Sequence, residues 1–228
     1  MMIKKRHEEF THLPPPQIRE VEKDEVITIG SIKVRFFAVT HTIPDSMGII
    51  FETPYGAIVI TGDVKLDHDG NGNMAAIEER EYGIFKDRKV LALMMDSTNT
   101  ERAGWSIPEK TVLDTLEQII KNNHGRLIVA TFSSQLERLM HIVRAAEKCG
   151  KKIVVDGRSM KTNIEIVREI GVLKHKDDTV ISVDHNDQYP PEKLLILATG
   201  AQADEFASLA PIGNKTHKQI RLTPKDTI

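Results

Sequence analysis

The sequence contains a single cysteine, Cys149, which excludes an internal disulfide framework and is typical of proteins in a reducing compartment such as the cytoplasm. It lacks any run of about 18 apolar residues, so we expect no transmembrane helix. No apolar segment follows the basic residues near the N-terminus, so we expect no secretory signal. Neither sign of charge is in excess, since the sequence has 31 Lys and Arg and 33 Asp and Glu. Nucleic-acid binding would therefore need a local basic groove.

What is present is the composition of an ordinary soluble globular protein. The 228 residues are 40% hydrophobic and 28% charged, which excludes a disordered or collagen-like chain. The length is sufficient to bury a core and predicts one domain or two small ones.

The pattern of residue types divides the chain into three parts. Residues 1–24 are charged and include Pro14-Pro15-Pro16, which predicts an extended arm or linker. Residues 25–105 are rich in strand-like runs, and one of these, the continuous apolar run 90–95, predicts a strand covered on both faces. The other expected strands are 25–29, 32–39, 47–53 and 57–61, with a helix at 74–85.

Residues 106–228 alternate between helical and strand-like patterns. Ser106 and Glu109 form a capping box, which predicts a helix with Ser106 as its N-cap. Gly150 and Gly171 are expected to end the next two helices. This alternation predicts a parallel sheet with helices on its faces. No G-x-G-x-x-G follows the first strand, so a dinucleotide site is not expected.

Two residues stand where metal ligands are often found. His41 follows the expected strand 34–39, and Asp63 follows the expected strand 57–61. We expect these strands to be antiparallel neighbours, so that the imidazole and the carboxylate converge on a Zn²⁺ or Mn²⁺ ion. The alternative is a structural histidine and an aspartate that caps a turn.

Seven segments, in order along the chain, resemble ribonuclease J, a family of the metallo-β-lactamase fold with an inserted β-CASP domain. The resemblance covers nearly the whole chain after the arm. The segments are 41–46 (HTIPDS), 61–67 (TGDVKLD), 96–99 (DSTN), 129–134 (VATFSS), 157–160 (GRSM), 198–202 (ATGAQ) and 217–220 (HKQI).

The resemblance implies an α/β fold class: part of a metallo-β-lactamase αββα sandwich over 25–105, then an incomplete, Rossmann-like β-CASP domain over 106–228. It implies that His41 is a metal ligand, that Asp63 bridges two metal ions, and that Asp96 supports the catalytic histidine. The implied cofactor is Zn²⁺ in a two-metal site, with Mn²⁺ or Mg²⁺ as alternatives. The implied substrate is RNA, cut internally or from its 5′ end.

The chain also departs from the pattern of that family. The H-x-H-x-D-H metal motif, the later S-G-H segment and the last metal histidine are absent, and Ser133-Ser134-Gln135 replaces the usual A-S-N. We therefore expect a chain that corresponds to the middle of a ribonuclease J and is inactive alone. A homo-oligomer or a completing chain is expected to cover the apolar inner face of the half-sandwich. The alternative is a non-catalytic RNA-binding or assembly module on the same scaffold.

A second candidate site is a calcium loop. Asp67, Asp69, Asn71 and Glu78 fit the pattern D-x-[DN]-x-[DN]-G-x₅-E, with Gly72 inside the loop. However, a strand and not a helix is expected to enter this loop. The alternative is therefore a surface turn rich in Asp, Asn and Gly.

A third candidate site is a phosphate-binding surface for RNA. Ser133 and Ser134 precede one expected helix, and Arg158 and Ser159 precede another, so helix N–H groups and one cation could bind phosphate. The alternative is that Ser133 or Ser159 is an N-cap. The remaining histidines of this half show no metal-ligand spacing and are expected at the surface: His124, His141, His175, His185 and His217.

Overall fold

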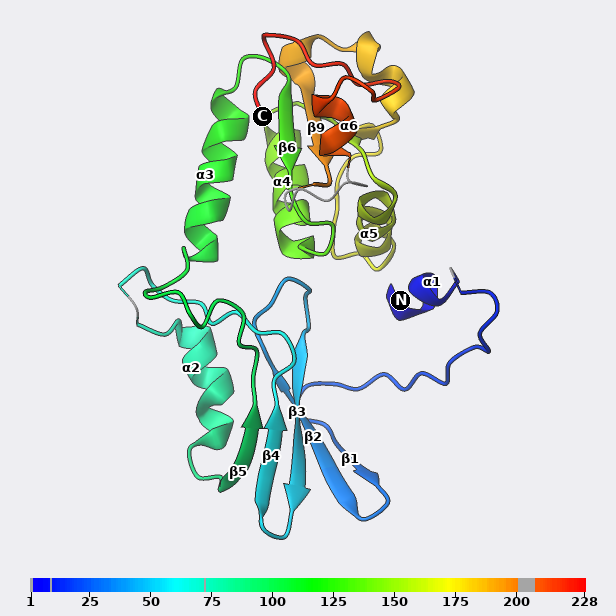
Figure 1. Cartoon of the computed structure of the whole chain (residues 1–228). Helices are drawn as coiled ribbons and strands as arrows, with labels where there is room; N and C mark the ends of the chain where they lie inside the picture. The colour runs from blue at the N-terminus through cyan, green and yellow to red at the C-terminus, as the bar shows by residue number, and fades with distance from the viewer. Residues whose placement is uncertain (1, 9, 72, 201–207) are drawn as a thin grey trace. The chain divides into compact units, whose positions relative to one another are not determined.

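The computed structural model describes the chain except residues 1, 9, 72 and 201–207. The chain folds into two compact units. The β-rich unit comprises residues 14–111, and the α/β unit comprises residues 112–228 together with residues 1–13. Each unit is described by itself below (Figure 1).

The β-rich unit is built on a five-stranded sheet with the order β1-β2-β3-β4-β5. The pairs β1–β2, β2–β3 and β3–β4 are antiparallel, whereas the pair β4–β5 is parallel. Gly30, with φ +61°, allows the tight turn between β1 and β2. The strands are β1 (Val26–Ile29), β2 (Ile32–Ala38), β3 (Met47–Thr53), β4 (Gly56–Ile60) and β5 (Val90–Met94).

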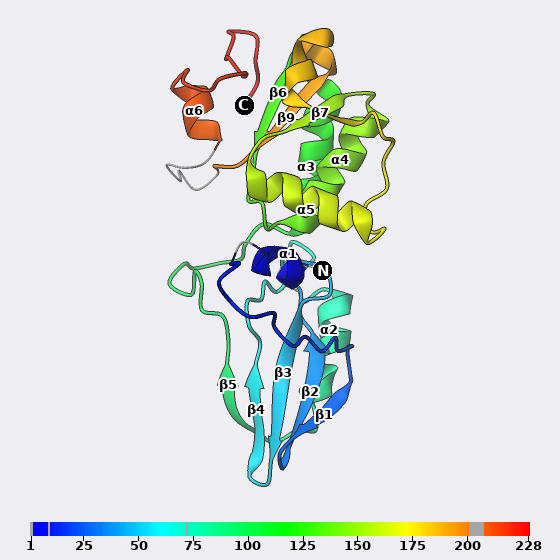
Figure 2. The ribbon, with the colours of Figure 1, turned by 90° about the vertical axis from the view of Figure 1, so that its right-hand side faces the viewer.

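Helix α2 (Ala76–Tyr82) covers one face of this sheet (Figure 2). Phe37 is the centre of the packing, because its ring makes edge-to-face contacts with Tyr82 and Phe85 at centroid distances of 6.3 and 5.1 Å. The backbone of Gly48 lies against the same ring, and a Cβ there would be 2.3 Å from a Phe37 ring carbon. The sequence therefore needs glycine at position 48 of β3.

The opposite face of the sheet is apolar along two complete rows of cross-strand partners. One row is Val34, Phe51, Ile58 and Ala92; the other is Phe36, Ile49, Ile60 and Met94. Val34 and Phe36 are buried, the four middle residues are half-buried, and Ala92 and Met94 are exposed.

Strand β5 corrects one expectation from the sequence. The strand forms as predicted, but it is exposed along its whole length instead of covered on both faces. The cause is its position, because β5 is the last strand at one edge of the sheet. An apolar run alone does not distinguish a central strand from an uncovered edge strand.

The α/β unit contains the expected parallel sheet, with the order β6-β9-β7-β8. Helices α4 and α6 lie on opposite faces of it (Figures 1 and 2). Gly150 and Gly171 end their helices with φ of +63° and +76°, as predicted. The elements are α3 (Glu109–Asn122), β6 (Leu127–Ala130), α4 (Leu136–Lys148), β7 (Lys152–Val155), α5 (Arg158–Glu169), β8 (Val180–Ile181), β9 (Leu194–Ala198) and α6 (Leu209–Gly213).

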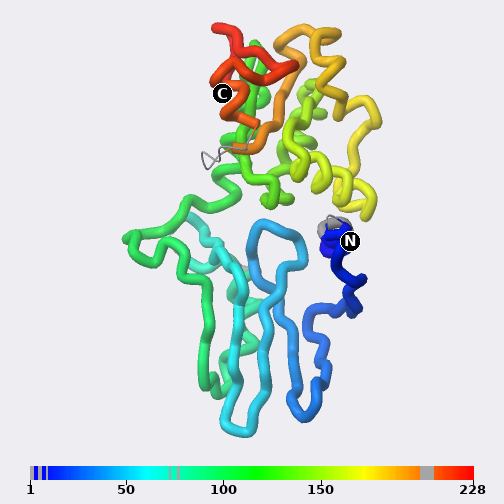
Figure 3. The backbone as a smooth tube through the Cα atoms, turned by 45° about the vertical axis from the view of Figure 1, so that its right-hand side comes forward, coloured from blue at the N-terminus to red at the C-terminus, as the bar shows by residue number. Residues whose placement is uncertain are grey.

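Both chain ends belong to the α/β unit. Helix α1 (Met2–His7) forms within the arm that the sequence predicted to be extended, whereas residues 14–20 have no regular structure. The C-terminal segment returns to the outer edge of β6, where the Thr227 carbonyl accepts from Ile128 N at 2.8 Å (Figure 3). The Arg126 side chain fixes this segment through two hydrogen bonds to the Asp226 carboxylate, at 3.0 and 2.6 Å.

Candidate functional site

Strand direction brings His41, Asp63 and Asp96 to one edge of the β-rich sheet. The strands that precede them, β2, β4 and β5, all run the same way, so the three residues follow carboxyl ends at the same edge. The expectation that β2 and β4 are antiparallel neighbours is wrong. Strand β3 lies between them, and they are parallel to each other.

Backbone hydrogen bonds tie these three segments together. Lys65 N donates to Thr40 O at 2.8 Å, which joins the segment after β4 to the segment after β2. Val64 N donates to Asp96 Oδ2 at 3.3 Å, which joins the segment after β4 to the segment after β5. The elements therefore hold the candidate residues as a connected group.

Of His41, Asp63 and Asp96, Asp96 is held by the most hydrogen bonds. Its Oδ1 accepts from Thr98 N at 2.8 Å. The Thr98 hydrogen bonds, the Val64 N–H and the charge of His41 together lower the pKa of the Asp96 carboxyl. His41 is half-buried, with Nδ1 3.3 Å from Thr42 Oγ1, while Asp63 is exposed.

The carboxyl edge of the α/β sheet collects the candidate phosphate-binding residues. Strands β6, β9 and β7 are parallel, so the segments that follow them meet at one edge. Asn163 in the middle of α5 donates from Nδ2 to Ser133 O at 2.7 Å, which joins α5 to the loop before α4. Ser134, Arg158 and Ser159 are exposed there.

The N-cap alternative for Ser133 and Ser159 does not hold. The residue before α4 is Gln135 and the residue before α5 is Gly157, and neither helix start has a side-chain capping hydrogen bond. The N–H groups in the first turn of a helix have no partner within the helix. The start of α5 therefore presents such groups next to the exposed Arg158 side chain.

Asp156 and His217 form a pair at this edge that sequence analysis missed. His217 Nε2 is 3.2 Å from Asp156 Oδ2, and its Nδ1 accepts from the N–H groups of Ile220 and Gln219 at 3.0 and 3.3 Å. These bonds place the ring proton on Nε2, which donates to the carboxylate. The expectation that His217 is a surface residue is wrong, since its side chain is only 14% exposed.

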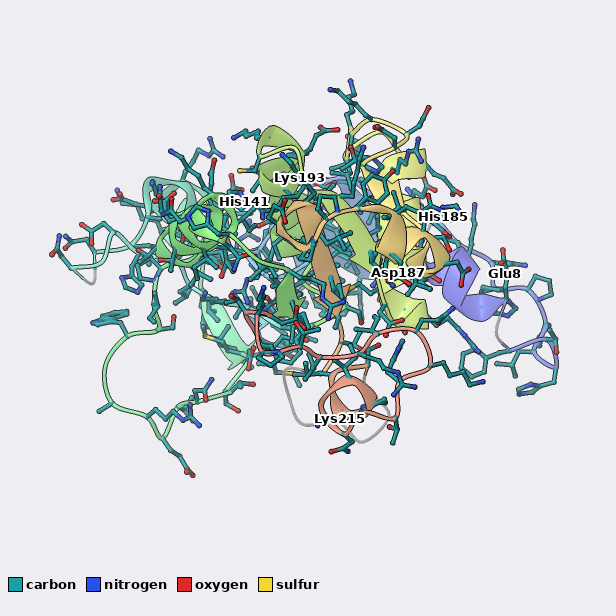
Figure 4. All side chains as sticks on the ribbon, turned by 90° about the horizontal axis from the view of Figure 1, so that it is seen from above. Glu8, His141, His185, Asp187, Lys193 and Lys215 are labelled. Atoms are coloured by element: carbon teal, nitrogen blue, oxygen red, sulfur yellow. The ribbon has the colours of Figure 1, made fainter. Side chains whose placement is uncertain are left out.

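The sequence held one local signal for this pair. Asp156 is the first residue after β7, and an acidic residue just past a strand end is the same kind of signal that singled out Asp63 after β4. His185, in contrast, is exposed as expected, together with Asp187 and Lys193 in the connection between β8 and β9 (Figure 4). Two buried polar atoms near the carboxyl end of β6, Thr131 Oγ1 and Gln135 Oε1, have no hydrogen-bond partner.

Comparison with known proteins shows what the chain is similar to. Residues 124–228 match the family model described as the β-CASP domain of ribonuclease J. Over these residues the chain is similar to ribonuclease J. Its fold is mixed α/β, with a β-CASP domain of the metallo-β-lactamase family, as the sequence predicted.

Three curated relatives show the extent of the similarity to ribonuclease J. Ribonuclease J2 of Bacillus subtilis is 33% identical over 227 residues, and the alignment covers 100% of this chain and 41% of the relative. Ribonuclease J 1 of Streptococcus pyogenes is 37% identical, covering 92% of this chain and 37% of the relative. Ribonuclease J of Thermus thermophilus is 34% identical, and the alignment covers 100% of this chain and 40% of the relative. The chain thus spans about two fifths of the length of these relatives.

One solved structure, a protein of unknown function from Enterococcus faecalis, shares the fold. Its TM-score is 0.58 at 18% identity, and the match covers 83% of this chain and 46% of that chain.

Ribonuclease J is a metal-dependent family, so the number of candidate ligands in the chain decides whether it could hold an ion. No group of three or more His, Cys, Asp or Glu side chains lies close enough to hold a metal within the described part of the chain. A two-metal centre needs more protein ligands than His41 and Asp63. The described residues therefore do not complete the metal site of the family.

The residues predicted as a calcium loop form a turn held by Asp69, which is the alternative that the sequence left open. Asp69 accepts from Asn73 Nδ2 at 2.9 Å and from Asn71 N at 2.8 Å, and these bonds lower the pKa of the Asp69 carboxyl. Glu78 is 1% exposed and accepts from Asp67 N at 3.4 Å. Gly72 of this loop lies outside the described residues, as do Ala201 and Gln202 of the ribonuclease J resemblance.

Gly157 allows the sharp entry into α5, and we predict that Gly157→Ala is destabilising. Its φ is +106°, and a Cβ would lie 2.9 Å from Thr199 Cγ2 and 3.2 Å from Ser208 Oγ. We expect a loss of about 1–3 kcal/mol in the free energy of unfolding, measured with urea. The matched control is Gly213→Ala in α6, where a Cβ meets nothing within 4 Å. Equal stability of the two variants would contradict the prediction.

Proposed function

We propose that this chain acts in ribonuclease J-like hydrolysis of RNA phosphodiester bonds, by internal cleavage or by removal of nucleotides from the 5′ end. The observation that carries the proposal is the convergence of His41, Asp63 and Asp96 at one sheet edge in a relative of ribonuclease J. The proposed location is the cytoplasm, in keeping with the single cysteine. None of the described helices has the length and apolar character to cross a membrane.

In this proposal each of the three residues has a separate role. His41 and Asp63 are ligands for Zn²⁺, Mn²⁺ or Mg²⁺, and Asp96 is a positioning residue whose ionised carboxylate holds the segments of the edge together. The remaining ligands must come from groups other than the described residues. A second copy of the chain or a completing chain is the proposed source, and the apolar rows of β2 to β5 offer the surface against which it packs.

The α/β unit is proposed to bind the RNA backbone. Arg158, the hydroxyl groups of Ser133, Ser134 and Ser159, and the first-turn N–H groups of α5 lie at one sheet edge and have the chemistry that phosphate requires. Because Asp156 precedes Gly157 directly, its bond to His217 positions the start of this helix.

The test of this surface is the loss of charge at Arg158. We expect Arg158→Ala to weaken binding of 5′-monophosphorylated RNA about 5-fold at low salt. We also expect the slope of the logarithm of affinity against the logarithm of salt concentration to become shallower by about 1, the value for one lost phosphate contact. Fluorescence anisotropy of labelled RNA over a KCl series measures both quantities.

The matched control is Lys148→Ala, because Lys148 is exposed at the other end of α4. This variant is expected to bind as the wild type does. Weaker binding by Lys148→Ala together with unchanged binding by Arg158→Ala would place the RNA elsewhere.

A second candidate function is a non-catalytic RNA-binding or assembly module on the same scaffold. The incomplete ligand set among the described residues favours it. RNA binding that is unchanged by EDTA and never followed by cleavage, with any partner chain, would support this candidate over the hydrolase.

A further inference from the structure

Trp105 is the single tryptophan of the chain, and its side chain lies at the surface. It is 70% exposed in the segment between β5 and α3, and the nearby Ile107 is 64% exposed. A tryptophan left in solvent is unusual, because tryptophan side chains are highly buried in most proteins. It therefore needs an explanation other than core packing.

The segment that carries Trp105 is held firmly. The His68 ring lies 5.5 Å from the Trp105 ring, centroid to centroid, at an angle of 47°. His68 itself is 7% exposed, and its Nδ1 accepts from Gly70 N at 3.1 Å. This bond leaves the proton on Nε2, which donates to Ser106 O at 2.6 Å, on the residue after the tryptophan.

These bonds also explain why Ser106 is not the N-cap that the sequence predicted. Helix α3 begins at Glu109, and the Ser106 carbonyl is used to anchor the loop to His68. Lys65 Nζ adds a bond to Ile107 O at 3.4 Å. The two residues that follow Trp105 are thus held in place and His68 lies against its ring, so less conformational freedom remains to be lost when a ligand contacts it.

We propose that Trp105 is a stacking platform for a base of single-stranded RNA. This inference rests on the proposed function and names a substrate-binding residue for it. A fixed aromatic ring with an open surface suits a nucleobase, because every base has a π-face whatever the sequence. The location also fits, because His68 is five residues from Asp63 and five residues of chain span at most about 18 Å. The ring therefore lies within reach of a strand whose phosphates are at the His41–Asp63 edge.

The test uses the intrinsic fluorescence of the protein, which comes from Trp105 as the single tryptophan. The full chain is titrated with oligoadenylate of about 10 nucleotides in EDTA, while anisotropy of the labelled RNA measures binding independently. We expect the fluorescence to be quenched with the same midpoint as the anisotropy change. We expect Trp105→Ala to weaken binding about 5- to 100-fold and Trp105→Phe to retain most of the affinity.

The matched control is Tyr55→Ala. Tyr55 is 75% exposed in the turn between β3 and β4. This turn lies at the amino end of β4, away from the carboxyl ends that carry His41, Asp63 and Asp96, so the loss of Tyr55 should leave binding unchanged. Urea unfolding of Trp105→Ala should match the wild type, since the side chain is exposed.

Three results would overturn the inference. RNA binding with unquenched fluorescence and full affinity of Trp105→Ala would reject the platform while leaving the proposed function intact. Fluorescence that changes with protein concentration alone would make Trp105 a contact between copies. Absence of any RNA binding by the wild type would reject both the platform and the RNA-binding part of the proposed function.

Discussion

Purified protein of these 228 residues is expected to leave 5′-monophosphorylated RNA uncut, even with Zn²⁺ or Mn²⁺ supplied. Hydrolysis by a two-metal site requires several ligands for each ion and an activated water between them. Of the candidate ligands, the described residues bring one imidazole, His41, and one carboxylate, Asp63, to the edge, and they form no group of three side chains that could hold a metal ion. The measurement is the size distribution of labelled RNA after incubation with each metal.

The comparison variant for this experiment is Asp63→Ala. Any trace of cleavage that persists equally in this variant comes from contaminating nuclease. Metal-dependent cleavage by the wild type that disappears in Asp63→Ala would contradict the prediction, and would mean that Asp67 or another residue completes a metal site. Restored cleavage on addition of a second chain, again lost in Asp63→Ala, would support the proposed completion of the site.

The second large effect is expected for Asp226→Asn, which breaks the ion pair that anchors the C-terminal segment to β6. The side chains of Arg126 and Asp226 are only 11% and 4% exposed. Removing one partner leaves a buried charge without compensation, which costs about 3–5 kcal/mol of unfolding free energy. Chemical denaturation measures this loss. The control is Asp178→Asn, because the Asp178 side chain is 68% exposed in its pair with Lys152 and an exposed pair contributes at most about 1 kcal/mol.

The same pair gives stability a defined dependence on pH. Burial raises the pKa of the Asp226 carboxyl, but the Arg126 hydrogen bond and charge and the Thr223 N–H outweigh burial, so the pKa is lowered overall. A carboxyl with a lowered folded-state pKa contributes stability above its unfolded value, about 3.9, and loses it as the pH falls through the folded value. The difference between wild type and Asp226→Asn should therefore shrink in acid. A constant difference down to pH 2 would contradict this assignment.

The sequence predicted what depends on local pattern. Short apolar runs in β2 and β3 and the helical repeats of α4 and α5 fix these elements locally, and positions such as His41 and Asp63 are visible because each follows a strand. It could not show which strands are neighbours, so the order that places β3 between β2 and β4 and leaves β5 at an edge was missed. The His217–Asp156 pair joins residues 61 positions apart, and the bond from His68 to the Ser106 carbonyl joins residues 38 positions apart. No periodic pattern in the sequence indicates either of these contacts.

The order of strands in the α/β sheet constrains how the chain folds during synthesis. Strand β9 pairs with both β6 and β7, yet it is made after both of them. Strands β7 and β8 can pair early through α5, but β6 has no partner in the sheet until residue 194 has left the ribosome. Until then, Leu127 and Ile128 remain without their neighbours from the central strand. A nascent chain stalled before β9 is therefore the most aggregation-prone species, and chaperone binding should fall sharply once residue 198 has emerged.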